Sequence, residues 1–201
     1  MFELERLLAL ARGGSGEALG RLLESYRAYL TVLARLQISK RLQSKADAAD
    51  LVQETFLQAH KHFAGFRGST EGELVSWLRQ ILAATLANLV RCYCGTRRRD
   101  IRLERQLAAD LDHSSRVLDG ALVTQDSSPS QRAARREQAV LLADALGKLP
   151  PDYREVIILR HLEGLSFAEV AERMGRSLDS VKRKWTPALA ELRSLLGGGS
   201  S

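Results

Sequence analysis

Residues 165–185 read LSFAEVAERMGRSLDSVKRKW, and this stretch predicts a helix-turn-helix. Ser166 lies three residues before Glu169, a spacing at which the serine can cap a helix and the glutamate can bond back to it. Gly175 follows the apolar pattern and tolerates the left-handed backbone of a sharp helix exit. Because Ser177 can cap the next helix, the layout is one that places a second helix in the DNA major groove.

Apolar residues recur with helical spacing on both sides of this glycine. They are Phe167, Val170, Ala171 and Met174 before it, and Val181, Trp185, Ala188, Leu189 and Leu192 after it. Five of the six charged residues from Arg173 to Lys184 are basic, the exception being Asp179. Cations suit a duplex, because each neutralised phosphate releases counterions. A plain helical hairpin with a solvated basic face is the alternative that this segment alone leaves open.

The composition of the 201 residues indicates a globular, all-α chain with room for one medium or two small domains. Hydrophobic residues make up 45%, four prolines are present, and β-branched runs are few. The net charge of +6 suits a polyanionic partner such as nucleic acid. No apolar run is long enough to span a membrane and no signal-peptide layout is visible, so we expect a cytoplasmic protein without membrane insertion.

The residue types that carry catalysis or bind metals are sparse. Cys92 and Cys94 are separated by one residue, which is wrong for a zinc knuckle, and they have no Cys/His pair nearby at ligand spacing. His113 and His161 also lack neighbours that suggest a metal or catalytic site. A nuclease would need clustered carboxylates, or a nucleophile with a base. We therefore expect no enzyme activity, no metal and no cofactor.

Apolar periodicity divides the chain into two helical domains. The first covers residues 1–97, with helical patterns at 2–11, 17–37, from about 47, and 73–93. Residues 98–131 lose this periodicity, apart from a candidate helix at 102–109, and end in a serine-proline cluster typical of a flexible linker. Periodicity returns over residues 132–196, which form the second domain.

Four stretches stand out by their order and spacing: DAADLVQETF at 47–56, WLRQIL at 77–82, LPPDYREV at 149–156, and the helix-turn-helix at 165–182. Together they resemble the signatures of the extracytoplasmic-function (ECF) sigma factors of bacterial RNA polymerase, and the match spans nearly the whole chain. The resemblance implies that residues 1–97 are sigma region 2 and residues 132–196 are sigma region 4. It implies no catalytic activity.

Such a factor binds core RNA polymerase, recognises the −10 and −35 elements of promoter DNA, and helps to open the duplex. The resemblance implies contacts with the clamp coiled coil and the flap of the polymerase, and an anti-sigma factor is a further expected partner. The alternative is a two-domain regulator that binds DNA without engaging polymerase. The motif at residues 50–56 separates the two hypotheses, because a simple regulator does not need it.

The segment from Asp50 to Phe56 resembles the surface that docks on the polymerase clamp. The expected contacts are apolar from Leu51, Val52 and Phe56, and polar or charged from Asp50, Gln53 and Glu54. A basic helical partner would complement these side chains. Helix capping is the alternative for the acidic residues, because carboxylates are favoured at a helix N-terminus, but it accounts for Asp47 and Asp50 alone.

Recognition of the −10 element is expected between His60 and Thr70 and on the helix that follows. Promoter opening needs a base held out of the stack, beside cations that track the single strand. The candidates are Phe63, Phe66, Arg67, Arg79, Gln80, Asn88, Arg91, Arg97 and Arg98. Core packing is the alternative for Phe63 and the favoured one for Trp77. Ala84 and Asn88 depart from the family's usual Asn and Asp, which leaves the −10 sequence open.

The helix that starts near Ser177 is expected to recognise the −35 element. The candidates are Arg176, Ser177, Asp179, Ser180, Lys182, Arg183 and Lys184. Lysine and arginine contact guanine or phosphate, and serine can bond to either. Pro187 stands where relatives usually have a basic residue, so it should kink this helix or end it early.

The acidic residues of the expected linker are Asp110, Asp112, Asp119 and Asp126. By resemblance to the family, they trace the path of RNA inside the polymerase. Generic disorder of a polar segment explains them equally well.

Overall fold

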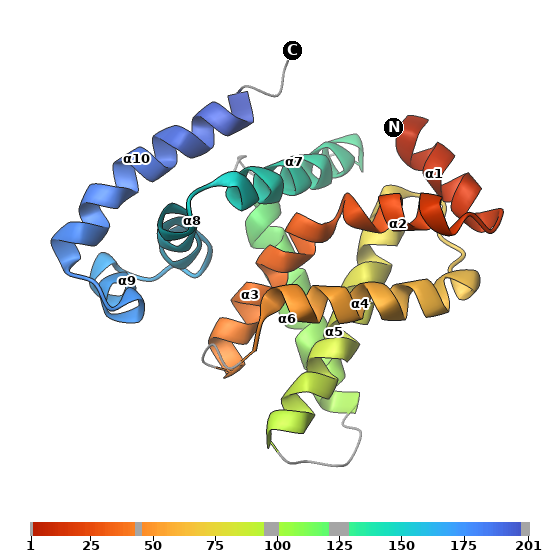
Figure 1. The fold of residues 1–201 in the computed structure, drawn as a ribbon, viewed down its shortest axis with the longest axis horizontal. Helices are drawn as coiled ribbons and strands as arrows, with labels where there is room; N and C mark the ends of the chain where they lie inside the picture. Colours follow the sequence, from red (N-terminus) through yellow and green to blue (C-terminus); the bar gives the residue numbers. More distant parts are fainter. Residues whose placement is uncertain (1, 43–45, 95–100, 121–128, 198–201) are drawn as a thin grey trace. The chain divides into compact units, whose positions relative to one another are not determined.

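The computed structural model of the chain describes residues 2–42, 46–94, 101–120 and 129–197. All regular structure in these ranges is helical, which confirms the predicted all-α fold class. The chain divides into two compact units, Met1–Ser115 and Arg116–Ser201 (Figure 1). None of the described helices is both long enough and apolar enough to cross a membrane.

The first unit is a bundle with a leucine-rich core. Its elements are α1 (Phe2–Arg12), α2 (Gly16–Glu24), α3 (Arg27–Leu42), α4 (Ala48–His62), the 3₁₀ helix η1 (Phe63–Gly65), α5 (Glu71–Cys94) and α6 (Ile101–Gly120) up to Ser115. Helix α1 packs on α2, while α3, α4 and α5 pack on one another (Figure 1). Leucines such as Leu30, Leu33, Leu74 and Leu86 are fully buried among them. Burial of these side chains stabilises the unit.

The pattern over residues 17–37, predicted as one helix, folds as two. Helix α2 ends at Glu24, where Ser25 Oγ donates to the carbonyl of Leu22 at 2.7 Å. The buried phenol of Tyr26 donates to Glu71 Oε1 at 3.2 Å. Burial and the neighbouring Glu71 carboxylate raise the pKa of Tyr26 well above its usual range. The apolar period continues across the break, so the sequence pattern alone did not reveal it.

Helix α6 contains the candidate helix at 102–109 and extends over further residues that were predicted to form a flexible linker. Leu107 and Leu111 are fully buried. Two further contacts hold α6 to α3: Gln37 Nε2 donates to Ser114 Oγ at 3.1 Å, and the Tyr29 hydroxyl donates to Ser115 Oγ at 2.9 Å. The expected linker over 98–131 therefore needs correction, since residues 101–115 belong to the first unit. Helix α6 has only about one leucine per turn among many charged residues. This apolar periodicity is too weak to predict from the sequence that the helix packs in the first unit.

The second unit is built around the helix-turn-helix. Its elements are α7 (Pro129–Lys148), α8 (Pro151–Ile157), the π-helical turn η2 (Ile158–Leu162), α9 (Phe167–Met174) and α10 (Leu178–Gly197). Val156, Leu159, Val170, Ala171 and Val181 form its core cluster, with Leu165, Phe167, Met174 and Trp185 packed against it. The apolar stripes predicted on both sides of Gly175 therefore meet in one core.

The LPPDYREV stretch forms the junction between α7 and α8. Pro151 starts α8, where a missing N–H costs the helix nothing. The Arg154 guanidinium donates to the carbonyls of Leu146, Gly147 and Leu149 at 2.8, 2.7 and 2.9 Å. It thereby satisfies carbonyls that the end of α7 leaves without intrahelical partners.

The turn between α9 and α10 has the predicted chemistry. The Ser166 N–H donates to Glu169 Oε2 at 2.7 Å, and the Glu169 N–H donates to Ser166 Oγ at 3.3 Å, which completes a capping box. These bonds lower the pKa of Glu169. Gly175 ends α9 with φ 60° and ψ 37°, the left-handed geometry that favours glycine. The Arg160 guanidinium donates to the carbonyl of Leu165 at 3.0 Å and lies 5.0 Å from the centre of the Phe167 ring.

Helix α10 continues through Pro187 to Gly197. The prediction that Pro187 could end this helix early is therefore wrong. Ala188 is fully buried and Leu192 is nearly so. Packing of these residues offsets the backbone hydrogen bond that proline removes.

The place of α6 in the first unit can be tested by Leu111→Ala. We expect the free energy of unfolding to fall by about 2–5 kcal/mol, because the substitution leaves a cavity in a close-packed core. Chemical denaturation measures the change. Gln106→Ala, at an exposed position of the same helix, is the control and should change stability by less than about 0.5 kcal/mol. Equal behaviour of the two variants would mean that α6 is not part of this core.

Candidate nucleic-acid interface

The first turns of α10 present cations to solvent. Ser177 caps the helix, with its Oγ accepting from the Ser180 N–H at 3.3 Å. Arg176, Lys182 and Arg183 are exposed, as are Ser177 and Asp179, whereas Ser180 is half-buried. Val181 points into the core and is fully buried. The start of α10 and the turn before it therefore have an exposed basic surface, which we call the α10 basic face and define as Arg176, Lys182 and Arg183.

Lys184, expected among the DNA contacts, has a different environment. Its ammonium bonds to Asp152 on α8, and Arg176 lies 3.9 Å from the same carboxylate oxygen. The Lys184 side chain is only 28% exposed. The hydrogen bond and charge of Lys184, with a smaller effect of Arg176, lower the pKa of Asp152. Lys184 therefore fastens α10 to α8 and is not an open contact, since a carboxylate already neutralises it.

The expected polymerase-docking segment lies on α4, and the structure separates its residues into core and surface. Asp47 caps the helix, accepting from the Ala49 N–H at 2.8 Å. The expectation that Leu51 and Val52 form apolar surface contacts is corrected, because they are 4% and 0% exposed. Phe56 is also buried, with the Arg27 guanidinium 4.8 Å from its ring centre. These side chains stabilise the unit instead of meeting a partner.

The exposed residues of this segment lie on one side of α4. Asp50, Gln53 and Glu54 are exposed, and so is Leu57, at 50%. Their i, i+3, i+4, i+7 spacing places the four side chains along one helical stripe. We call them the acidic face of α4. Leu57 was not among the predicted residues, although this same spacing identifies it.

A groove of about 380 Å³ borders this face, between α4 and α5. Asp50 and Glu54 line it from α4, and Asn88 and Tyr93 line it from α5. Asn88 was expected to contact the −10 element. It lines this groove with Asp50 and Glu54, whereas Phe63 and Arg67 line a different cavity. The Asn88 side-chain oxygen accepts from the Arg91 guanidinium.

Two other arginines expected to face DNA are bound within the first unit. Arg79 Nε lies 2.8 Å from Asp112 Oδ1, and Arg79 Nη1 donates to Tyr29 and Ser115, both at 3.2 Å. The Arg91 guanidinium lies 3.5 Å from Glu104. The Arg79 and Arg91 side chains are only 16% and 14% exposed.

These contacts change several expectations. Arg79 and Arg91 hold α5 to α6 instead of facing the strand, because their charges are paired inside the unit. Asp112 pairs with Arg79 and is not an open linker acid. Gln80 is exposed on α5, as expected. Arg97, Arg98 and Asp126 lie outside the described residues, as does the side chain of Asp119.

The loop after α4 is packed on an aromatic cluster. The ring centres of Phe63, Phe66 and Trp77 lie 6.0, 6.1 and 4.9 Å apart in the pairs 63–66, 63–77 and 66–77. Both phenylalanines are less than a tenth exposed. They therefore form the inner wall of the expected −10 loop, and Arg67, which is exposed, lies on its outside.

Hydrogen bonds and close packing fix the conformation of this loop. The Glu73 carboxylate accepts from the Ser69 and Thr70 N–H groups at 2.8 and 3.0 Å, and these bonds lower the pKa of Glu73. A Cβ atom at Gly68 would lie 2.5 Å from the Phe66 ring and 2.7 Å from Glu73 Cβ. Only glycine fits at this position without a shift of its neighbours.

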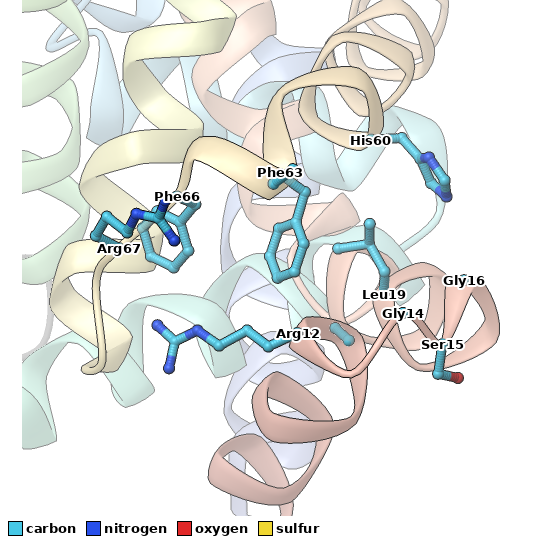
Figure 2. Close-up of a pocket in the computed structure, with 11 residues that line it drawn as sticks. Arg12, Gly14, Ser15, Gly16, Leu19, His60, Phe63, Phe66 and Arg67 are labelled. Carbon is cyan, nitrogen blue, oxygen red and sulfur yellow. The ribbon is translucent and has the colours of Figure 1, made fainter.

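A cavity of about 530 Å³ lies beside the loop (Figure 2). Arg12 extends from α1 towards Phe66 and Arg67, and its guanidinium donates to the carbonyl of Gly68. Leu19 and the turn around Gly14 line the other side. Sequence reasoning missed Arg12, because no local pattern joins it to a loop that follows so much later in the chain.

Comparison with known families assigns both units. Residues 22–93 match sigma-70 region 2, and residues 139–192 match sigma-70 region 4. The chain is 30% identical to the ECF RNA polymerase sigma-E factor of Haemophilus influenzae, over 72% of this chain and 71% of that protein. It is 29% identical to the RNA polymerase sigma factor CnrH of Cupriavidus metallidurans, over 98% of this chain and 97% of that protein.

The ECF RNA polymerase sigma factor SigE of Mycolicibacterium smegmatis is 31% identical over 77% of this chain, which spans only 54% of the length of that relative. Among solved structures, CnrH in complex with the cytosolic domain of CnrY is similar at 27% identity and a TM-score of 0.37, over 98% of this chain and 99% of that one. The protein belongs to a class of DNA-binding transcription initiation factors, the sigma factors. Within that class, the chain belongs to the ECF RNA polymerase sigma factors.

The ion pair between α8 and α10 leads to a prediction about Asp152. Lys184→Ala should raise the pKa of Asp152 towards its ordinary value, whereas Lys182→Ala, at an exposed position, should leave it unchanged. Because the folded-state pKa is depressed, any stabilisation from this pair is present above the unfolded-state pKa and is lost as the pH falls through the folded-state pKa. Carboxyl NMR titration of the three proteins measures the pKa. Equal values in all three would contradict the assigned contact.

Proposed function

We propose that this protein directs core RNA polymerase to promoters, with the second unit binding the −35 element and the first unit binding the polymerase clamp and the −10 element. The observation that carries the proposal is the presence of two exposed charged surfaces on two separate units. The α10 basic face suits DNA, and the acidic face of α4 suits a basic helical partner. The protein acts as a non-catalytic subunit in the cytoplasm. An anti-sigma factor and the polymerase flap remain expected partners from the family resemblance.

In the second unit, α9 and the Gly175 turn hold α10 so that its first turns enter the major groove. Lys182 and Arg183 extend from these turns and contact phosphates or guanine. Ser177 and Ser180 sit at the same end, where serine hydroxyls bond to base or phosphate, and Asp179 completes the candidate set. Arg176 is exposed, but it lies near the Asp152 carboxylate that also binds Lys184. It therefore contributes to DNA binding alongside Lys182 and Arg183, with its charge partly offset by Asp152.

In the first unit, the acidic face of α4 binds a basic helical partner such as the clamp coiled coil. Asp50 and Glu54 supply the charges, and Gln53 supplies hydrogen bonds. Leu57 takes the apolar role that Leu51 and Val52 cannot fill, because it is the apolar residue that this stripe exposes. Charge complementarity of this kind raises the association rate and fixes the orientation of the partner.

The −10 element binds along the loop that follows α4 and the exposed side of α5. Arg67 and Gln80 are exposed there, and the Phe63 and Phe66 rings support the loop from inside. Arg79, Asn88 and Arg91 act indirectly, because each already has a partner within the unit. Their part is to hold the helix that carries the exposed contacts.

Reconstitution with core RNA polymerase tests the proposal. We expect the chain to form a complex at submicromolar concentration and to support run-off transcription from a library of genomic promoters. Asp50→Ala combined with Glu54→Ala should weaken this complex about tenfold or more, because two charges opposite a basic partner are lost. Binding of a −35 duplex should be unaffected.

Glu5→Ala, which removes an exposed acid from α1, is the matched control and should leave the complex unchanged. Absence of any complex with the wild-type chain at micromolar concentration would refute the proposal. It would favour a regulator that binds DNA alone.

The two lysines near the start of α10 should differ in their effect on −35 binding. Lys182→Ala should weaken binding of a −35 duplex about tenfold and reduce the salt dependence, d log K/d log [salt], by about 0.9, because one phosphate contact is lost. Lys184→Ala should have the smaller effect, since Asp152 already neutralises this lysine. Fluorescence anisotropy at several salt concentrations measures both quantities. If Lys184→Ala reduced the salt dependence as much as Lys182→Ala, the assignment of the α10 basic face would be wrong.

A further inference from the structure

One carboxylate in the second unit lies against two of the cations that were expected to contact DNA. Asp152 lies in the first turn of α8. Its Oδ2 atom bonds to the Lys184 ammonium of α10, and it lies 3.9 Å from the Arg176 guanidinium, in the turn before α10. Lys182 and Arg183 remain exposed. The cations of the expected −35 interface are therefore divided between Asp152 and solvent.

Asp152 lowers the positive charge that the start of α10 presents to a phosphate backbone. Arg176, Lys184 and Asp152 together carry one positive charge, instead of the two that the cations alone would carry. The hydrogen bond with Lys184 lowers the pKa of Asp152, so the carboxylate stays ionised at neutral pH. Its side chain is 42% exposed, so the negative charge is open to the solvent from which DNA approaches. Because phosphate contacts form with any sequence, Asp152 reduces sequence-independent binding.

The ion pair also fixes the position of α10 on α8. The Lys184 side chain is only 28% exposed and reaches across to α8, in addition to the apolar core that Val156 of α8 and Val181 of α10 share. Base-edge contacts require side chains at defined positions, whereas attraction to phosphates tolerates a shift along the duplex. A contact that holds α10 in place therefore favours sequence-dependent binding.

We propose that Asp152 determines the specificity of the −35 interface, as a positioning residue that acts through Lys184 and Arg176. It keeps these cations from phosphates at arbitrary sites and holds α10 where Lys182 and Arg183 reach base edges. This inference rests on the proposed function, since it requires that α10 binds the −35 element. The quantity that Asp152 sets is the ratio of specific to non-specific affinity, which decides how a DNA-binding protein is distributed over a genome.

An acid at this position also has a simpler explanation, because carboxylates are favoured in the first turn of a helix. That explanation accounts for Asp152 within α8, but it does not account for a bond to an ammonium on α10. The two explanations differ in their consequences. An acid that serves α8 alone affects the stability of the unit and leaves the preference of α10 among DNA sequences unchanged.

Release of the two cations should favour non-specific complexes more than specific ones. In a specific complex, base contacts fix the register of α10, so a released Lys184 meets a phosphate only if one lies within its reach. In a non-specific complex nothing fixes the register, and the helix settles where its cations contact the most phosphates. Substitution of Asp152 should therefore raise the two affinities by different factors.

The experiment measures binding of the full-length chain to two fluorescent duplexes of equal length, over a range of salt concentrations. One duplex carries the −35 element of a promoter that the reconstituted holoenzyme transcribes, and the other carries the same bases in scrambled order. Asp152→Asn should raise the affinity for the scrambled duplex about tenfold and increase the salt dependence by about 0.9, the value for one phosphate contact. The affinity for the −35 duplex should rise only about threefold, so the ratio of the two affinities falls about threefold.

Asp144→Asn is the matched control, because it removes an exposed acid from α7 of the same unit. It should leave the ratio of the two affinities unchanged. Asp152→Glu keeps the charge and should keep the salt dependence of the wild type. Asp152→Asn combined with Lys184→Gln should lose the added salt dependence, because the released lysine is then absent.

Substitution of Asp152 leaves the apolar core between α8 and α10 intact, so the variants should fold. Asp152→Ala removes the same charge, and it keeps the test decisive if Asp152→Asn is unstable. Equal effects of Asp152→Asn and Asp144→Asn would overturn the proposal. So would an unchanged ratio of the two affinities, and so would weaker binding to both duplexes, because Asp152 would then only support the fold.

Failure of this inference can be told from failure of the proposed function. If the wild-type chain binds the −35 duplex and the scrambled duplex equally, the proposed recognition of the −35 element is wrong. If the wild type prefers the −35 duplex and Asp152→Asn keeps both its preference and its salt dependence, only the role of Asp152 is wrong.

Discussion

The ion pair between Arg79 and Asp112 determines how the first unit is built. A guanidinium that is mostly buried needs a partner, because an unpaired charge away from water is costly. Asp112 supplies that partner from α6, and Tyr29 and Ser115 accept the remaining bonds. Helix α6 must therefore dock on the unit for Arg79 to be stable in its place. The docked helix in turn decides which side of α5 faces solvent.

The same principle sorts the cations of both units into two groups. Arg79, Arg91 and Lys184 have carboxylate partners on a neighbouring helix, and their bonds fix how those helices meet. Arg67 and Lys182 are exposed, and among the described residues neither has a carboxylate partner. A count of basic residues along the sequence does not distinguish these groups. The distinction depends on acids that lie on other helices, far away along the chain.

Local chemistry could be predicted from the sequence, and long-range contacts could not. The capping box of Ser166 and Glu169 and the exit at Gly175 depend on neighbouring residues, so their spacing is sufficient. The docking of α6 depends instead on single leucines and on polar partners in α3 and α5. The bond from Arg12 to Gly68 crosses from the first helix to the −10 loop, and no periodicity records such a contact.

The DAADLVQETF segment shows why resemblance alone misassigned Leu51 and Val52. A helix that lies on a core has to use one side of each turn for packing, so a continuous motif contains both structural and exposed residues. Val52 and Thr55 are fully buried, and Thr55 donates to the carbonyl of Leu51 at 2.7 Å. Substitution at Val52 would therefore weaken any interaction of α4 by unfolding the helix that presents it. A loss of polymerase binding is evidence of a contact only for exposed positions such as Asp50 and Leu57, where stability and binding are separable.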